Sequence, residues 1–205
     1  MSEIGPSHVM GFSTGGSIAQ YAAIDHPEAV LSLALIVSAS RLSEEGRETC
    51  ERWRVLTREA QFQELWADMA SATVTGEKSK RLARAFMKVF GRIALGAPSD
   101  PSDFPTPLEA DLGHDTTGRL AEISAPTLIV GGSGAPFFLK DLLRETAESM
   151  PMPPCACTRA SSTGFSGRAR KRRYEDDVLA FLEGRPESSS GEACRTKPRR
   201  TKEMG

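Results

Sequence analysis

Apolar residues in this chain fall into short unbroken runs and into longer stretches with helical spacing. The short runs are bounded by turns and predict buried strands of a parallel sheet: residues 8–10, 31–37 and 125–130. The longer stretches predict helices: residues 14–25, 43–96, 137–150 and 171–183. Because strand, helix and strand follow within about 30 residues, the pattern predicts a right-handed βαβ unit and an α/β fold.

The longest helical stretch, residues 43–96, carries apolar side chains three and four residues apart and includes both tryptophans. We interpret these apolar residues as core packing, and the lining of a ligand pocket is the alternative. The intervening faces are rich in Arg, Glu and Lys and are expected to be solvated. The apolar positions are Trp53, Leu56, Ala60, Phe62, Leu65, Trp66, Met69, Leu82, Phe86, Val89, Phe90 and Ile93.

A Gly-x-Ser-x-Gly motif, with Ser13 at its centre, joins the first predicted strand to the first predicted helix. A serine in such a tight bend has an exposed hydroxyl, and Gly11 and Gly15 are expected where the strand and helix backbones pass closely. The free N–H groups of the new helix point at the bend, so the backbone N–H of Thr14 is a candidate oxyanion donor. The motif therefore predicts Ser13 as a nucleophile.

Glycine-rich turns between a strand and a helix also bind phosphates, but this turn lacks the residues that such sites need. A phosphate-binding P-loop needs a lysine at its end, and the first lysine of the chain is Lys78. A dinucleotide-binding turn needs glycine where Ser13 stands. An ordinary glycine-rich turn without a catalytic role stays open, because the motif alone does not show a reaction.

In its strand–turn–helix context the motif resembles the nucleophile elbow of the α/β-hydrolase family, over about residues 7–183. In that family about four strands and a Gly-rich loop precede the elbow, so the resemblance implies a partial α/β-hydrolase fold with a parallel sheet from the elbow strand onward. It also implies a helical cap insertion at about 43–118. The remaining residues, 184–205, are polar and basic and are predicted to form a disordered tail.

The resemblance places a triad acid after the strand at 125–130 and a histidine after one further strand. The acid position is most consistent with Ala135, which has no carboxylate, and no triad histidine is identified. His114 precedes the strand at 125–130, where the family has no base, and is expected to be a surface residue. Residues 151–164 contain three prolines in four residues and no strand alternation, which argues against a central strand there.

Residues 151–164 allow two interpretations. One is a divergent, irregular loop. The second is a compensated frameshift, because suitable codons for residues 154–165, translated two nucleotides out of phase, give Leu-Arg-Leu-His-Glu-Gly-Val-Glu-His-Gly-Leu. That frame contains an alternating strand followed by Gly-x-x-His-Gly, and the nucleotide sequence decides between the two.

The composition and charge of the chain argue against several classes of binding partner. The chain has 205 residues, a net charge of −1, 39% apolar residues and 26% charged residues, typical of a globular protein. Because the net charge is close to zero, no electrostatic field attracts nucleic acid or an anionic membrane, and we expect neither as a partner. The chain has no signal pattern and no apolar run of membrane-spanning length, so we expect a cytoplasmic protein. The basic residues of the tail are interpreted as solvated. The four cysteines, Cys50, Cys155, Cys157 and Cys194, match neither a disulfide framework nor a metal site, and we expect no cofactor.

Two functions follow from these residues. The first is a serine hydrolase in which Ser13 attacks an ester, lactone or similar small acyl substrate. The second is a catalytically inactive relative that binds a ligand or partner, because the triad acid and histidine are not found. The substrate and the oligomeric state are left open.

Overall fold

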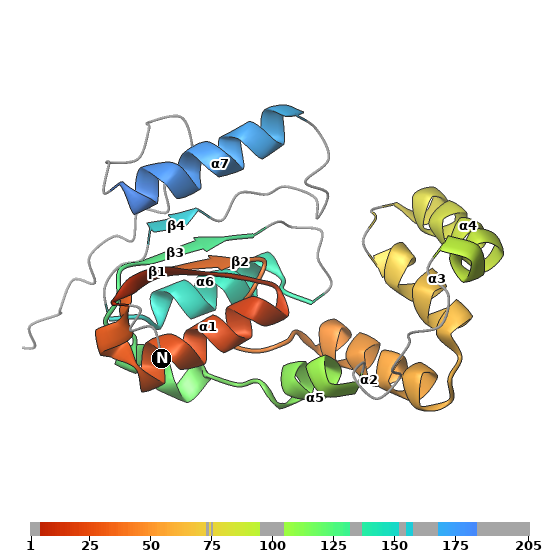
Figure 1. Cartoon of the computed structure of the whole chain (residues 1–205), viewed down its shortest axis with the longest axis horizontal. Helices are drawn as coiled ribbons and strands as arrows, with labels where there is room; N and C mark the ends of the chain where they lie inside the picture. The colour runs from red at the N-terminus through yellow and green to blue at the C-terminus, as the bar shows by residue number, and fades with distance from the viewer. Residues whose placement is uncertain are drawn as a thin grey trace, which may run out of the picture.

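Four parallel strands form the centre of the molecule, in the spatial order β1-β2-β3-β4 (Figure 1). The computed structural model describes residues 5–72, 74, 76–94, 105–131, 137–151, 155–157 and 168–183. The strands are β1 (Ser7–Phe12), β2 (Val30–Ile36), β3 (Thr127–Val130) and β4 (Cys155–Cys157). Their register pairs Gly11 with Leu35, Leu35 with Ile129 and Ile129 with Ala156. The predicted parallel sheet is therefore confirmed.

Helices cover both faces of this sheet. Helices α1 (Thr14–Asp25) and α6 (Lys140–Glu148) lie on one face, and α7 (Arg168–Leu182) lies on the other (Figure 1). In β2, Leu33 and Leu35 pack in the larger core with α1 and α6, whereas Ala34 and Ile36 pack with Val178 of α7. Since successive side chains of a strand point to opposite faces, burial on both sides explains the continuous apolar run of β2.

The described residues between β2 and β3 are mostly helical. They include α2 (Glu44–Arg58), α3 (Phe62–Ala72), α4 (Glu77–Ala94), α5 (Pro105–Gly113) and the 3₁₀ helix η3 (Thr117–Glu122), while a shorter one, η1 (Pro27–Ala29), follows α1. The Ser43 side chain caps α2 by accepting a hydrogen bond from the Gly46 N–H at 2.9 Å. Helices α3 and α4 stand away from the sheet and are called the arm (Figure 1).

The core-packing interpretation holds for only part of the helical stretch. Trp53, Phe62 and Leu65 are buried as expected. On α4, however, the interpretation is wrong, because Leu82, Phe86, Val89 and Phe90 are between 48% and 72% exposed. Spacing of apolar residues locates one face of a helix, but it does not show what that face packs against.

The segment after α6 also differs from expectation. Residues 155–157 form β4, which pairs with β3 from Leu128–Cys155 to Val130–Cys157, so the interpretation as an irregular loop is wrong for these three residues, whereas the argument against a central strand is not contradicted. The prolines precede these three residues, and β4 lies at the edge of the described sheet, where a short strand pairs on one side only. Helix α6 begins at Lys140, three residues later than predicted. Residues 184–205 lie outside the described residues.

Across the described part of the chain, none of the helices has the length and apolar content needed to cross a bilayer.

Candidate active site

Ser13 lies at the bend between β1 and α1 with φ 52° and ψ −125°, a conformation that residues other than glycine rarely adopt. Its N–H donates a hydrogen bond to the Ile36 carbonyl at 2.9 Å, and its own carbonyl accepts from the Gly16 N–H at 2.8 Å. The side chain is half-buried and makes no capping hydrogen bond to α1. The backbone thus fixes the serine at the start of a helix while its hydroxyl stays uncommitted to that helix.

Glycines at the bend allow the strand and the helix to touch. A Cβ on Gly11 would lie 2.4 Å from the Gly15 carbonyl oxygen and 2.5 Å from Gly16 Cα. Gly16 is equally crowded, because its Cβ would lie 2.3 Å from Ser38 Cβ. A Cβ on Gly15 would meet nothing within 4 Å, so Gly15 takes part in the close approach through its backbone, while Gly11 and Gly16 are the positions that have no room for a side chain.

Thr14, the candidate oxyanion donor, forms a side-chain hydrogen bond with α5, the last α-helix before β3. Its hydroxyl donates a hydrogen bond to Asp111 Oδ2 of α5 at 2.7 Å. Burial raises the pKa of Asp111, and the Thr14 hydrogen bond and the charge of His114 oppose that rise only partly. The second carboxyl oxygen, Oδ1, is buried without a hydrogen-bond partner. A partly desolvated carboxyl group therefore contacts the residue next to the predicted nucleophile.

A second unusual backbone conformation lies at the end of β2. Val37 has φ 51°, which is strained for a β-branched residue, and its N–H donates to the Val130 carbonyl at 2.7 Å. The carbonyl of the preceding residue, Ile36, accepts the N–H of Ser13. Ser13 and Val37 therefore follow the C-terminal ends of two neighbouring parallel strands, β1 and β2, at the same end of the sheet. Backbone strain of this kind concentrates at functional sites, which supports the C-terminal end of the sheet as the candidate active site.

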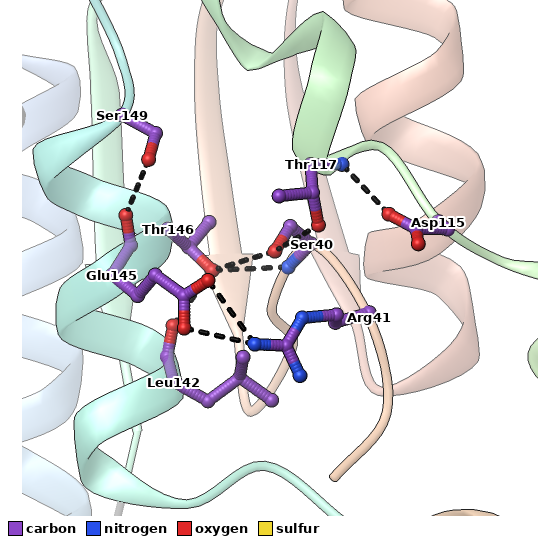
Figure 2. Close-up of polar contacts among 8 residues, drawn as sticks. All are labelled: Ser40, Arg41, Asp115, Thr117, Leu142, Glu145, Thr146 and Ser149. Carbon is purple, nitrogen blue, oxygen red and sulfur yellow. Dashed lines mark hydrogen bonds and ion pairs between the residues drawn. The ribbon is translucent and has the colours of Figure 1, made fainter.

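The loop after β2 is held by polar contacts from α6 and from the residues near η3, as Figure 2 shows. The Ser40 N–H donates to Thr146 Oγ1 at 3.0 Å, and Thr146 Oγ1 donates to the Leu142 carbonyl at 2.8 Å. Arg41 forms an ion pair with Glu145 at 2.9 Å. These contacts fix the loop that follows the strained end of β2.

No histidine of this chain contacts Ser13, and all three lie in the described part. His8 is in β1 and shares a 2.8 Å hydrogen bond with Ser32 Oγ, and His26 ends α1 with a largely exposed side chain. His114 is 2% exposed, so the expectation of a surface position is wrong. It packs edge-on against Tyr21, and its Nε2 lies 3.1 Å from the Ala39 carbonyl.

The triad positions implied by the family resemblance are only partly described. Ala135 and residues 158–164 lie outside the described residues. Sequence reasoning missed Asp111 and the strained Val37, and neither carries a motif that would have identified it. Among the described residues there is no group of three His, Cys, Asp or Glu side chains arranged to hold a metal. Burial raises the pKa of Cys50 to about 12, so its thiol is a poor nucleophile.

Solved structures with the same fold were found, whereas no family model and no curated protein sequence matches the chain. An enol-lactonase from Burkholderia xenovorans is 20% identical with a TM-score of 0.69, and the match covers 88% of this chain and 67% of that one. An α/β-hydrolase enzyme from a Medee basin deep-sea metagenome library is 15% identical, with a TM-score of 0.70 and coverage of 91% and 68%.

A thermophilic esterase from Thermogutta terrifontis gives a TM-score of 0.62 at 19% identity, with coverage of 88% of this chain and 65% of that one. This chain thus spans about two thirds of the length of the structures it matches. The described strands and helices form a partial α/β-hydrolase fold.

Proposed function

We propose that this chain, which has a partial α/β-hydrolase fold, is a serine hydrolase that uses Ser13 to attack an ester, lactone or similar small acyl substrate. The observation that carries the proposal is the strained backbone of Ser13, at φ 52° and ψ −125°, between β1 and the first turn of α1. Structures with the same fold include an enol-lactonase and an esterase, which supports this class of substrate.

In this proposal the Ser13 hydroxyl adds to the substrate carbonyl, and negative charge develops on the carbonyl oxygen. The N–H of Thr14, at the N-terminus of α1, would donate to that oxygen, where the helix dipole also favours negative charge. The Thr14 hydroxyl is already committed to Asp111, which holds the first turn of α1 in place. Collapse of the tetrahedral intermediate would break the bond to the alkoxide of the ester or lactone, which takes a proton from water. The acyl group would then stay on Ser13 Oγ until water releases it as the carboxylic acid.

The Ser13 proton has to leave for a base. Because none of the three histidines contacts Ser13, we expect hydroxide to take this proton. The rate of acylation should then rise continuously with pH, without the plateau near neutrality that a histidine base produces. Loss of a triad member typically lowers the rate by several orders of magnitude, so slow acylation is expected.

The test is labelling of the purified chain with a fluorophosphonate probe at several pH values. We expect labelling that is lost in Ser13→Ala and retained in the matched control Ser7→Ala, whose serine begins β1 away from the bend. Free imidazole supplies a base from solution and should accelerate labelling of the wild type but not of Ser13→Ala. Labelling that persists in Ser13→Ala contradicts the proposal.

A catalytically inactive, ligand-binding relative is the second candidate, and the positions of the three histidines favour it. In that case the folded wild-type chain and Ser13→Ala would show the same background labelling, with or without imidazole. Turnover of p-nitrophenyl butyrate would likewise be equal in the two proteins. Wild-type turnover that disappears in Ser13→Ala would instead exclude this second candidate.

A further inference from the structure

The exposed apolar residues of α4 lie on one side of the helix. Leu82, Phe86, Val89 and Phe90 recur four, seven and eight residues along, the spacing that places side chains on one helical face. The rings of Phe86 and Phe90 lie 4.8 Å apart, so the two aromatic side chains form one continuous surface. We call these four residues the apolar arc of α4.

The apolar arc points away from α3. Arg84 forms ion pairs with Glu64 and Asp68 of α3, and Lys88 forms one with Glu64. Because each residue turns a helix by about 100°, Phe86 lies about 200° around the axis from Arg84 and from Lys88. Helix α4 therefore turns its charged side toward its neighbour and its apolar side outward, the reverse of a helix that packs on a core.

Unpaired basic residues lie beside the apolar arc and on the polar face of α4. Lys78 lies one turn before Leu82, at one edge of the apolar arc, and Arg81 lies farther around the axis, on the polar face; both are exposed and without an ion pair among the described residues. The only acidic residue of α4, Glu77, pairs with Lys80, and Glu64 and Asp68 of α3 pair with basic residues on the other side of α4. The unpaired charge that α4 presents beside the apolar arc and on its polar face is thus positive.

We propose that the apolar arc of α4 docks on the surface of an anionic lipid bilayer, with α4 lying in the plane of the interface. A helix with aromatic and aliphatic residues on one face and Lys and Arg beside them is the kind that binds this way. The apolar arc enters the boundary of the acyl chains, while Lys78 and Arg81 contact anionic headgroups.

Pairing of the apolar arc with a second copy of α4 fits the charges less well. Copies that met through the apolar arc would bring their Lys78 side chains close to one another, and Glu77, the acid of each α4, is already paired with Lys80, whereas an anionic surface attracts these lysines. The net charge of −1 for the whole chain hides this local charge, because α4 holds six basic residues and a single acidic one. The expectation of no membrane partner rested on that average.

The test is flotation of the full chain with vesicles made of equal parts phosphatidylglycerol and phosphatidylcholine, compared with phosphatidylcholine alone. We expect binding to the anionic vesicles that weakens at high salt and is much weaker on the neutral ones. Equal binding to both vesicles, or no binding to either, overturns the proposal.

Two double variants, a test and a matched control, locate the binding surface. Leu82→Ser with Val89→Ser should lower binding by about tenfold or more, because two apolar side chains no longer enter the bilayer. The matched control, Leu179→Ser with Val55→Ser, removes similarly exposed residues from α7 and α2 and should bind like the wild type. Equal losses in both double variants overturn the proposal.

A third variant tests the unpaired basic residues. Lys78→Gln with Arg81→Gln should also lower binding about tenfold, whereas Arg144→Gln, on α6, should not. All of these substitutions are at exposed or half-exposed positions, so circular dichroism should show unchanged folding. Light scattering is run alongside: a wild-type dimer that Leu82→Ser with Val89→Ser converts to monomer assigns the apolar arc to a second copy and overturns the proposal.

Discussion

The sheet and the arm differ in the interactions that stabilise each of them. In the sheet, Leu33, Leu35 and Ile36 of β2 are completely buried between helices on both faces. In the arm, α4 exposes its apolar arc, and ion pairs from Arg84 and Lys88 connect its other side to α3. The comparison teaches that helical amphipathicity alone does not decide which side of a helix packs inward, because a buried charge network can set the orientation instead.

Asp68 is the centre of that network. It is 7% exposed, and its carboxylate accepts hydrogen bonds from Arg52 Nε and Trp53 Nε1 at 2.9 Å each and from Arg84. One carboxylate on α3 therefore connects α2, α3 and α4. A buried charge is costly unless it is fully paired, so the orientation of α4 depends on these partners.

The largest expected effect is a loss of stability when the packing between β1 and α1 is disturbed. Gly11→Ala would place a Cβ 2.4 Å from the Gly15 carbonyl oxygen, and because that contact is with backbone, β1 or α1 has to move. We expect a loss of about 3 kcal/mol or more in the free energy of unfolding, measured by urea denaturation followed by circular dichroism.

Gly15→Ala is the matched control for this prediction. Nothing lies within 4 Å of the added Cβ, and alanine favours the helix, so stability should stay the same or rise by about 0.5 kcal/mol. Failure of Gly11→Ala to fold beside a soluble Gly15→Ala protein counts as the expected result. Similar stability in the two variants would show that the close approach at Gly11 does not constrain the bend.

A smaller effect is expected on the arm. Asp68→Ala removes the common acceptor of Arg52, Trp53 and Arg84, and we expect a loss of about 2 kcal/mol, discounted because both arginines are partly exposed. Both tryptophans of the chain lie in α2 and α3, so tryptophan fluorescence reports this region separately from circular dichroism. The fluorescence transition should move to lower urea.

The control for the arm is Glu109→Ala, which breaks the exposed ion pair with Arg58. That change should cost less than about 0.5 kcal/mol. If Glu109→Ala and Asp68→Ala cost the same, the buried network does not hold the arm.

Acid should loosen the arm in a way that depends on Asp68. Burial alone would raise the pKa of Asp68, but hydrogen bonds from Arg52, Arg84 and Trp53 outweigh burial and hold that pKa below its ordinary value. A carboxyl group with a lowered pKa contributes stability above its unfolded pKa of about 3.9, and this stability is lost as pH falls through the folded value. Tryptophan fluorescence should show this acid transition in the wild type and a reduced one in Asp68→Asn.

The bend at Ser13 could be predicted from sequence because its signals are local. A strand, two glycines around a serine, and a helix lie within a few residues of one another, and the structure places the strained backbone there. The contact between Thr14 and Asp111 could not be predicted in this way, because 97 residues separate the two partners. The apolar spacing of α4 correctly located one face of the helix but gave the wrong environment for it.

His114 shows a similar limit, because its position before β3, where the family has no base, suggested a surface residue. Burial depends instead on contacts with Tyr21 of α1 and the carbonyl of Ala39, both distant along the chain. The three-residue β4 was missed because prolines dominate its local sequence, while pairing with β3 supplies the order. Non-local partners of this kind leave no periodic trace in the sequence.

The smallest expected effect is a pH dependence of stability that comes from His114, a buried residue that packs beside the sheet. Burial lowers the pKa of His114, and the hydrogen bond to Ala39 and the charges of Asp111 and Asp115 offset this only partly. Since the unfolded chain then binds a proton more readily than the folded one, stability is present above about pH 6.5 and falls as pH drops through the folded pKa.

Urea midpoints followed by circular dichroism at about pH 7.5 and about pH 5.5 test this sign. His114→Phe keeps a ring against Tyr21, and the Ala39 carbonyl still accepts from Gln20 Nε2, so the fold should survive while the fall in midpoint shrinks. The matched control is His26→Gln, which replaces a largely exposed histidine and should show the same fall in urea midpoint as the wild type. A fall of equal size in His114→Phe would assign the acid sensitivity to groups other than His114, and the buried imidazole would then be a neutral packing residue.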